Sequence, residues 1–170
     1  MGPPVAPSFA LVDHDGRPVT EADFRGRFLL VYFGFTHCRV VCPRTATRLC
    51  GAIEDLGAGA HFVQPLYITV DPERDTPEVM RAFLQNRFPA FLGLTGPPQP
   101  IAAAKAQFRV FAERKSDPQD PSGYAVPHSA TAFLVSPEGA FLAHFPDTLS
   151  REAITKRIQA YIDSVGASPC

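Results

Sequence analysis

The strongest constraint on the fold is a continuous apolar, β-rich run, Phe28–Phe33, that leads within a few residues into a helical pattern. Such a run is expected of a strand that is buried on both faces of a sheet. Pro43 suits the first position of the helix. Apolar residues then recur at three- and four-residue steps: Ala46, Leu49, Ile53 and Leu56. The sequence therefore predicts a buried strand that turns directly into a helix, with Cys38 and Cys42 at the turn.

Strands and helices also alternate along the rest of the chain, separated by residues that favour turns and caps. Strand–helix alternation implies parallel strands, and a late hairpin turn at Ser136–Gly139 adds antiparallel ones. The other predicted strands are 9–12, 18–20, 62–70, 131–135 and 140–145, and the other predicted helices are 77–88, 101–111 and 150–164. Thr76 is expected to cap the first of these helices, with an apolar face of Val79, Phe83, Leu84 and Phe88.

These elements predict an α/β protein: a thioredoxin-like mixed sheet with flanking helices and an N-terminal β-hairpin. The length of 170 residues suits one domain. We expect an extended Pro-rich tail at 1–8, a thioredoxin-like domain at 9–165 and a flexible C-terminal tail at 166–170. Sites in such sheets lie beyond the carboxyl ends of the strands, where the cysteine pair and the segment before Thr131 are expected to meet.

Charge and hydropathy exclude several classes of function. The formal net charge of −1 gives no electrostatic reason to expect nucleic acid or anionic lipid as a partner. No apolar stretch approaches the roughly 18 residues of a membrane span, and the first residues lack the pattern of a signal peptide. The chain is therefore either cytosolic or normally preceded by a targeting segment. Four cysteines are too few and too unevenly spaced for a disulfide framework.

The pair Cys38 and Cys42 carries the first chemical signal. With Pro43 as the first helical residue, Cys42 becomes the expected N-cap, so that unpaired N–H groups and the helix dipole lie beside both sulfurs. That environment, together with Arg39, favours the thiolate. Two thiolates within one turn either form a disulfide or bind a soft metal ion. Three residues lie between Cys38 and Cys42, whereas ordinary dithiol oxidoreductases have two between their cysteines. The alternative interpretation is that Cys38 and Cys42 are buried structural thiols.

His128 carries the second signal, because it lies in a Pro-rich loop directly before a predicted buried strand. One imidazole and two thiolates would make a three-coordinate site suited to Cu(I), whereas zinc would want a fourth ligand or an open water position. Spacing alone does not select this residue, since a lone histidine is usually a polar surface residue.

Four segments, in order between about Phe28 and Phe145, resemble the Sco/SenC family of copper proteins that serve the assembly of cytochrome c oxidase. The segments are Tyr32–Pro43, Ile68–Pro77, Phe91–Gly96 and Tyr124–Gly139. The resemblance implies a thioredoxin fold and one copper ion per chain, Cu(I) or Cu(II), bound at the positions of Cys38, Cys42 and His128. It also implies an N-terminal anchor, outside this sequence, that faces the periplasm or the intermembrane space; we expect tethering to the inner membrane on the periplasmic side. The implied partners are cytochrome c oxidase subunit II or another copper-site protein, and other copper chaperones.

Three positions depart from the family's pattern. Arg39 and Val40 stand where the family usually has Pro and Asp, and Pro127 stands where it usually has Asp directly before the histidine. An acidic neighbour can orient an imidazole or receive a basic group of a partner. The departures leave the three implied ligands in place but bear on metal affinity and on the choice of partner.

Further candidates have structural alternatives. His37 would be an accessory ligand or proton donor, or simply an exposed strand-end residue. Asp71 would approach the site from the end of the second buried strand, or only terminate that strand. Arg74 and Asp75 are interpreted as structural residues at a helix start. Cys50 is expected to pack as a small apolar residue.

Two functions follow from these residues. The first is a metallochaperone that delivers copper to the dinuclear copper site of cytochrome c oxidase subunit II. The second is a thiol–disulfide reductase that uses Cys38 and Cys42 on the cysteines of a periplasmic copper-site protein. The two can coexist, because cysteines must be reduced before they bind copper. A peroxidase of the same fold ranks last, because its Pro-x-x-x-Thr pattern before the cysteine is missing.

Overall fold

The computed structural model of the chain describes residues 7–38, 41–120, 123–126 and 130–166. Its strands are β1 (Ala10–Asp13), β2 (Pro18–Thr20), β3 (Phe28–Gly34), β4 (Val63–Thr69), β5 (Leu92–Thr95), β6 (Lys115–Ser116), β7 (Tyr124–Ala125), β8 (Thr131–Val135) and β9 (Phe141–Pro146). Its helices are α1 (Val41–Asp55), α2 (Pro77–Arg87), α3 (Pro98–Gln107) and α4 (Arg151–Gly166), with two 3-10 helices, η1 (Glu21–Phe24) and η2 (Gly57–Phe62).

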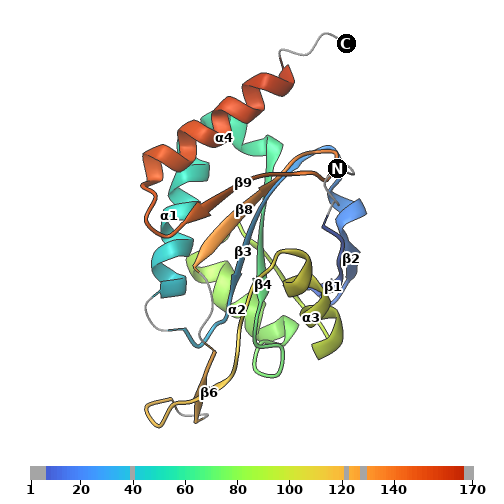
Figure 1. Cartoon of the computed structure of the whole chain (residues 1–170), viewed down its shortest axis with the longest axis vertical. Coiled ribbons are helices and arrows are strands. Elements are labelled where there is room, and N and C mark those ends of the chain that lie inside the picture. Colours follow the sequence, from blue (N-terminus) through green and yellow to red (C-terminus); the bar gives the residue numbers. More distant parts are fainter. Residues whose placement is uncertain (1–6, 39–40, 121–122, 127–129, 167–170) are drawn as a thin grey trace.

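A seven-stranded mixed sheet, in the order β2-β1-β5-β4-β3-β8-β9, forms the centre of the molecule (Figure 1). The middle strands β3, β4 and β5 run parallel, with Phe28 opposite Val63 and Gly34 opposite Thr69. Strands β1, β8 and β9 add antiparallel pairs on either side. The carboxyl ends of β3, β4 and β5 therefore meet at one edge of the sheet, where the chain turns from β3 toward α1.

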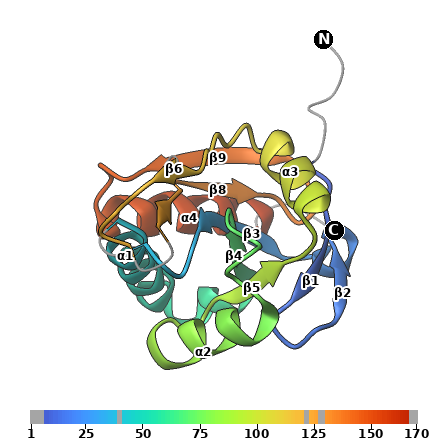
Figure 2. The same cartoon turned by 90° about the horizontal axis from the view of Figure 1, so that it is seen from below.

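Burial on both faces explains why β3 is apolar throughout, since each of its seven residues is buried. Tyr32 packs edge-on against Tyr67 on one face, and Phe33 packs against Phe108, at the end of α3, on the other. Helices α1, α2 and α4 cover the first face and α3 the second (Figure 2). The buried Ile154 and Ile158 of α4 extend this core.

Helix α2 confirms one prediction and corrects another. Thr76 caps the helix, because its Oγ1 accepts a hydrogen bond from the N–H of Val79 at 3.3 Å. Val79 itself is exposed, so its assignment to the apolar face was wrong; Met80 and Leu84 are buried instead. Both of these side chains press on Gly93 of β5, where a Cβ would meet Leu84 Cδ1 at 2.8 Å. The buried face of α2 is therefore set by packing against a glycine of β5, and the periodicity of the helix sequence does not reveal this contact.

Three short strands were not predicted. β5 joins the main sheet beside β4, and β6 and β7 pair as a separate two-stranded hairpin, with Ser116 opposite Tyr124. Two or four residues carry too little periodicity to mark a strand. Helix α3 begins at Pro98, three residues before its predicted start, with proline in its first turn.

Within the described ranges, no helix is both long enough and apolar enough to cross a bilayer. The predicted terminal tails fall mainly on residues 1–6 and 167–170, which lie outside the described residues.

Candidate functional site

The cysteine pair lies where β3 passes into α1. The N–H of Cys38 donates to the carbonyl of Phe35 at 3.2 Å, and the N–H of Cys42 donates to the sulfur of Cys38 at 3.4 Å. First-turn N–H groups have no acceptor within their own helix, so the Cys38 sulfur serves as that acceptor. The helix begins at Val41, so Cys42 is a first-turn residue and its prediction as N-cap was wrong. The fold thus holds both sulfurs at the mouth of α1.

The two thiols differ in their surroundings. Cys42 is fully buried, whereas Cys38 is half-buried. The hydrogen bond with the Cys38 side chain and then burial raise the pKa of the Cys42 thiol far above its usual range. The expected preference for thiolate was therefore wrong for Cys42, because these effects outweigh the helix dipole. A bound metal cation would shift the equilibrium from thiol to thiolate, since a coordinated thiol loses its proton.

Aromatic rings form the floor beneath the cysteine turn. Tyr32 and Tyr67 pack edge to face with ring centroids 5.7 Å apart, and the Tyr67 hydroxyl donates to the carbonyl of Phe35 at 3.4 Å. A tyrosine phenol is already uncharged at neutral pH, and burial raises the pKa of both phenols further. Gly34 is required at the end of β3, because a Cβ there would lie 2.4 Å from the Tyr67 oxygen. The rings can therefore lie close under the turn.

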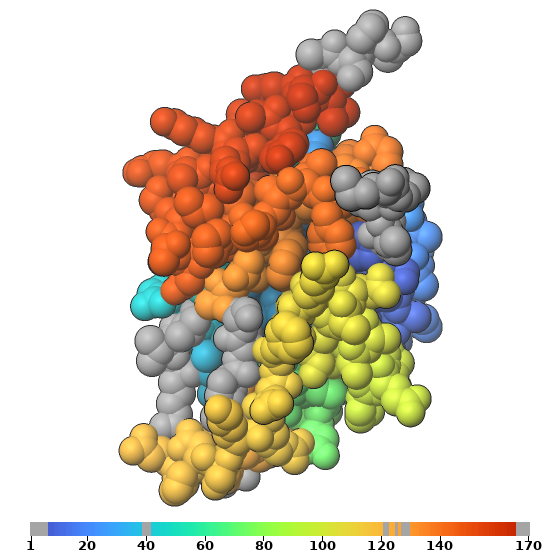
Figure 3. Space-filling view, in the orientation of Figure 1, coloured from blue at the N-terminus to red at the C-terminus, as the bar shows by residue number. Residues whose placement is uncertain are grey.

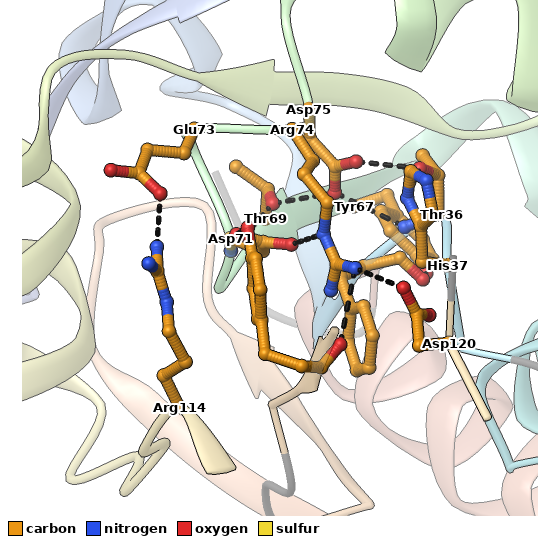
Figure 4. A network of polar contacts seen from close by, with 12 residues as sticks. Thr36, His37, Tyr67, Thr69, Asp71, Glu73, Arg74, Asp75, Arg114 and Asp120 are labelled. Carbon is orange, nitrogen blue, oxygen red and sulfur yellow. Dashed lines mark hydrogen bonds and ion pairs between the residues drawn. The ribbon is translucent and has the colours of Figure 1, made fainter. Parts of the chain in front are cut away.

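Asp75 joins the ends of three parallel strands beside the cysteine turn. Figure 4 shows its contacts with Thr36 and Thr69. Its buried carboxylate accepts the N–H of Thr36 at 3.1 Å and the hydroxyls of Thr36 and Thr69 at 2.5 Å and 2.7 Å. Its carbonyl oxygen accepts the Thr95 hydroxyl at 2.6 Å. Burial raises the pKa of Asp75, although the threonine hydrogen bonds act in the opposite direction. Asp75 therefore fixes the residue two positions before Cys38.

Asp71 is buried just after the end of β4, where it contacts Arg74 and Tyr124. It pairs with Arg74, and its Oδ1 accepts the hydroxyl of Tyr124 at 3.0 Å. Arg74 also pairs with the buried Asp120, its Nη1 lying 3.0 Å from the carboxylate. Sequence interpretation had given Arg74 only a role at a helix start. The signal available was its place in the second of the four segments that resemble the family.

Of the two remaining predicted residues, His37 and His128, the structure describes only His37. His37 is exposed, with Nδ1 3.2 Å from the hydroxyl of its neighbour Thr36. His128 lies outside the described residues, as do Arg39, Val40 and Pro127. Among the residues that the structure does describe, no group of three or more His, Cys, Asp or Glu side chains is arranged to hold a metal ion.

The mixed sheet, its flanking helices and the dithiol at the turn from strand to helix define a thioredoxin-like α/β protein, as predicted. A sequence model of the SCO1/SenC family matches residues 2–163. The chain belongs to this family, which confirms the resemblance seen in the sequence.

Individual relatives agree with this assignment. The mitochondrial SCO2 homolog of Bos taurus is 42% identical over 158 residues, which cover 91% of this chain and 58% of that protein. Bradyrhizobium japonicum ScoI, solved with copper bound, is 32% identical with a TM-score of 0.83, covering 92% of this chain and 99% of that one. Yeast Sco1 with copper bound is 30% identical with a TM-score of 0.81, covering 98% and 91%. The chain thus spans less than two thirds of the length of its bovine relative.

Proposed function

We propose that this chain carries copper for the assembly of cytochrome c oxidase, binding one ion through Cys38, Cys42 and His128. The observation that carries the proposal is the cysteine pair at the mouth of α1, where the N–H of Cys42 contacts the Cys38 sulfur at 3.4 Å. Two polarizable sulfurs with one imidazole suit Cu(I). The copper-bound relatives of the same fold support this reading.

The segments on either side of His128 support it as the third ligand. Tyr124 is held at the carboxyl edge of the sheet by Asp71. Strand β8 begins at Thr131 and runs antiparallel to β3, with Ala132 opposite Tyr32. The chain therefore enters and leaves the undescribed residues 127–129 near the edge where β3 ends, which is also the edge of the cysteine turn.

Delivery to a partner requires that the ion be released by ligand exchange. The half-buried Cys38 is the sulfur that a partner's ligand reaches first, and Cys42 behind it is fully buried. The β6–β7 hairpin projects from the end of the molecule opposite α4 (Figures 1 and 3). Lys115 and Ser116 of β6 are exposed. We propose the dinuclear copper site of oxidase subunit II as the acceptor and the periplasmic side of the inner membrane, reached through a preceding anchor, as the location.

A second candidate is a thiol–disulfide reductase, which the unequal burial of the two thiols favours. The thiolate of Cys38 would attack a partner's disulfide and form a mixed disulfide, releasing one partner thiol. Cys42 would then attack Cys38, freeing the second partner thiol and leaving an oxidised Cys38–Cys42 pair. The raised pKa of Cys42 slows the second step unless a base removes its proton.

Anaerobic titration with Cu(I) against a competing chelator tests the proposal. We expect saturation at one equivalent, and we expect His128→Ala to weaken binding by about 10-fold or more. His61→Ala is the matched control, because His61 is exposed on η2, before the amino end of β4 and therefore at the opposite edge of the sheet. Equal affinity of His128→Ala and the parent, with disulfide formation intact, would contradict the three-ligand site and favour the reductase.

A further inference from the structure

Tyr124 is fixed through its ring, its hydroxyl and its backbone. The ring lies between two guanidinium groups, with Arg74 Cζ at 3.8 Å and Arg114 Cζ at 4.0 Å from its centroid. Its hydroxyl donates to Asp71 at 3.0 Å, and its carbonyl oxygen accepts from Arg74 Nη1 at 3.2 Å. Cation–π contacts and a charge-assisted hydrogen bond each favour one geometry. The chain therefore has a defined position and direction at Tyr124, four residues before His128.

Arg74 is an internal ion between two internal carboxylates. Its side chain is 9% exposed, and those of Asp71 and Asp120 are 2% and 5% exposed. The charges must be desolvated, so such a cluster contributes little net stability compared with apolar packing. Its hydrogen bonds instead select one arrangement of the groups that it joins. Here it joins the turn after β4 to the segment that contains Asp120 and Tyr124.

The same short turn also holds the cysteines. Asp71 and Arg74 bind the Tyr124 segment, while Asp75, the next residue after Arg74, binds Thr36 through its carboxylate (Figure 4). The Asp75 N–H donates to the carbonyl of Asp71 at 3.0 Å, which closes the turn on itself. Five consecutive residues thus set the position of Tyr124 relative to the turn that carries Cys38.

We propose that Arg74 and Tyr124 are positioning residues of the copper site, and we call their contact the Arg74–Tyr124 clamp. The clamp acts through His128: by fixing the chain at Tyr124 against the turn that also holds Thr36, it restricts where the imidazole can lie relative to the two sulfurs. This inference rests on the proposed function. It assigns to the turn after β4 a role in metal affinity.

A double-mutant cycle on Cu(I) affinity tests the clamp. Tyr124→Leu removes the ring and the hydroxyl, and we expect about a 10-fold loss of affinity. In the His128→Ala background the same change should alter affinity less than about 2-fold, because the residue acts through the imidazole. A purely structural role would give equal losses in both backgrounds. Tyr161→Leu is the matched control, since the Tyr161 hydroxyl donates to the Leu142 carbonyl at the opposite edge of the sheet.

Two further measurements make the outcome decisive. Tyr124→Phe keeps the ring between the guanidinium groups and loses only the hydrogen bond to Asp71, so it should retain the fold. We expect about a 3-fold loss of affinity, which corresponds to part of the energy of a hydrogen bond to a charged group. The nitrogen hyperfine coupling in the electron paramagnetic resonance spectrum of the Cu(II) form should weaken in Tyr124→Leu and stay unchanged in Tyr161→Leu. Parent-like affinity and hyperfine coupling in both Tyr124 variants would overturn the clamp while leaving the proposed function intact. A parent-like His128→Ala would overturn both.

Discussion

At the scale of single residues, the two cysteines of the site are chemically unequal. Cys38 is half-buried and accepts a backbone N–H, whereas Cys42 is fully buried with a thiol pKa raised by its contact with Cys38 and by burial. Cys50, farther along the same helix, is partly buried, and burial followed by the charge of Glu54 raises the pKa of its thiol to about 11. Only the thiolate is a strong nucleophile, so exposure and pKa together rank the reactivity of these thiols.

This ranking predicts the order of alkylation in the reduced, metal-free protein. Among Cys38, Cys42 and Cys50, we expect iodoacetamide at pH 8 to modify Cys38 first, with Cys42 and Cys50 at least about 10-fold slower, because a pKa three units above pH 8 leaves about 0.1% thiolate. Peptide mapping by mass spectrometry over a time course gives the three rates separately. Bound Cu(I) should protect Cys38 and leave the rate at Cys50 unchanged. Faster labelling of Cys42 than of Cys38 would contradict the observed burial.

At the scale of elements, Asp147 ties the connection between β9 and α4 to the first turns of α1. Its carboxylate accepts the Thr45 hydroxyl at 2.9 Å and pairs with Arg44 and with Arg48, whose Nη1 lies at 3.0 Å. Partial burial acts to raise the pKa of Asp147, but the hydrogen bonds from Thr45 and Arg44 and the nearby charges outweigh it and leave the pKa below its usual value. These contacts hold the cysteine-bearing end of α1 against the rest of the fold.

Asp147→Asn should therefore destabilise the protein in a pH-dependent way. A carboxyl whose folded pKa is lowered stabilises above its unfolded value of about 3.9, and that contribution is lost as the pH falls through the folded pKa. Denaturant unfolding should show a loss of about 1 kcal/mol at pH 7, since the group is partly exposed, and the loss should shrink as the pH falls below the unfolded pKa and through the lower folded pKa. Asp163→Asn, near the end of α4, serves as the control. A pH-independent difference would argue against an ionised Asp147 as the cause.

At the scale of the whole molecule, one core spans both faces of the sheet and the polar groups at its carboxyl edge bond to one another. Asp75 joins the ends of β3, β4 and β5 through Thr36, Thr69 and Thr95, using only protein groups. Structural metals, in contrast, are needed where a small domain cannot bury enough apolar surface. We therefore expect the chain to fold cooperatively without copper and to use the ion as cargo.

Thermal unfolding with and without copper checks this expectation. Chelation should leave the far-ultraviolet circular dichroism unchanged, and Cu(I) at about 100 times its Kd should raise the free energy of unfolding by about 2.7 kcal/mol. For a domain of this size that corresponds to a rise in Tm of about 5–10 °C. Cys38→Ser should keep the metal-free Tm and lose most of the rise. Unfolding of the parent on chelation would show that the metal is structural.

Much of the fold could be predicted because its strongest signals are local. The apolar run of β3, the turn to α1 and the Thr76 cap each reflect neighbouring residues, and the structure has all three. β5 and the β6–β7 hairpin were missed because pairing with distant strands, and not their own short sequences, makes them strands. The burial of Met80 in place of Val79 depends on Gly93, a residue thirteen positions farther along the chain.

The class of fold, the family and the place of the cysteine pair could be predicted, because a buried strand that turns into a helix is encoded by contiguous residues. The difference between Cys42 and Cys38 and the contacts of Arg74 arise only when distant parts of the chain come together. The contact with the Cys38 thiol and then burial raise the pKa of Cys42, although the helix dipole acts to lower it. The partners of Arg74 include Asp120 and Tyr124, which lie 46 and 50 positions away. Interactions of this kind depend on distance in space, which local patterns do not contain.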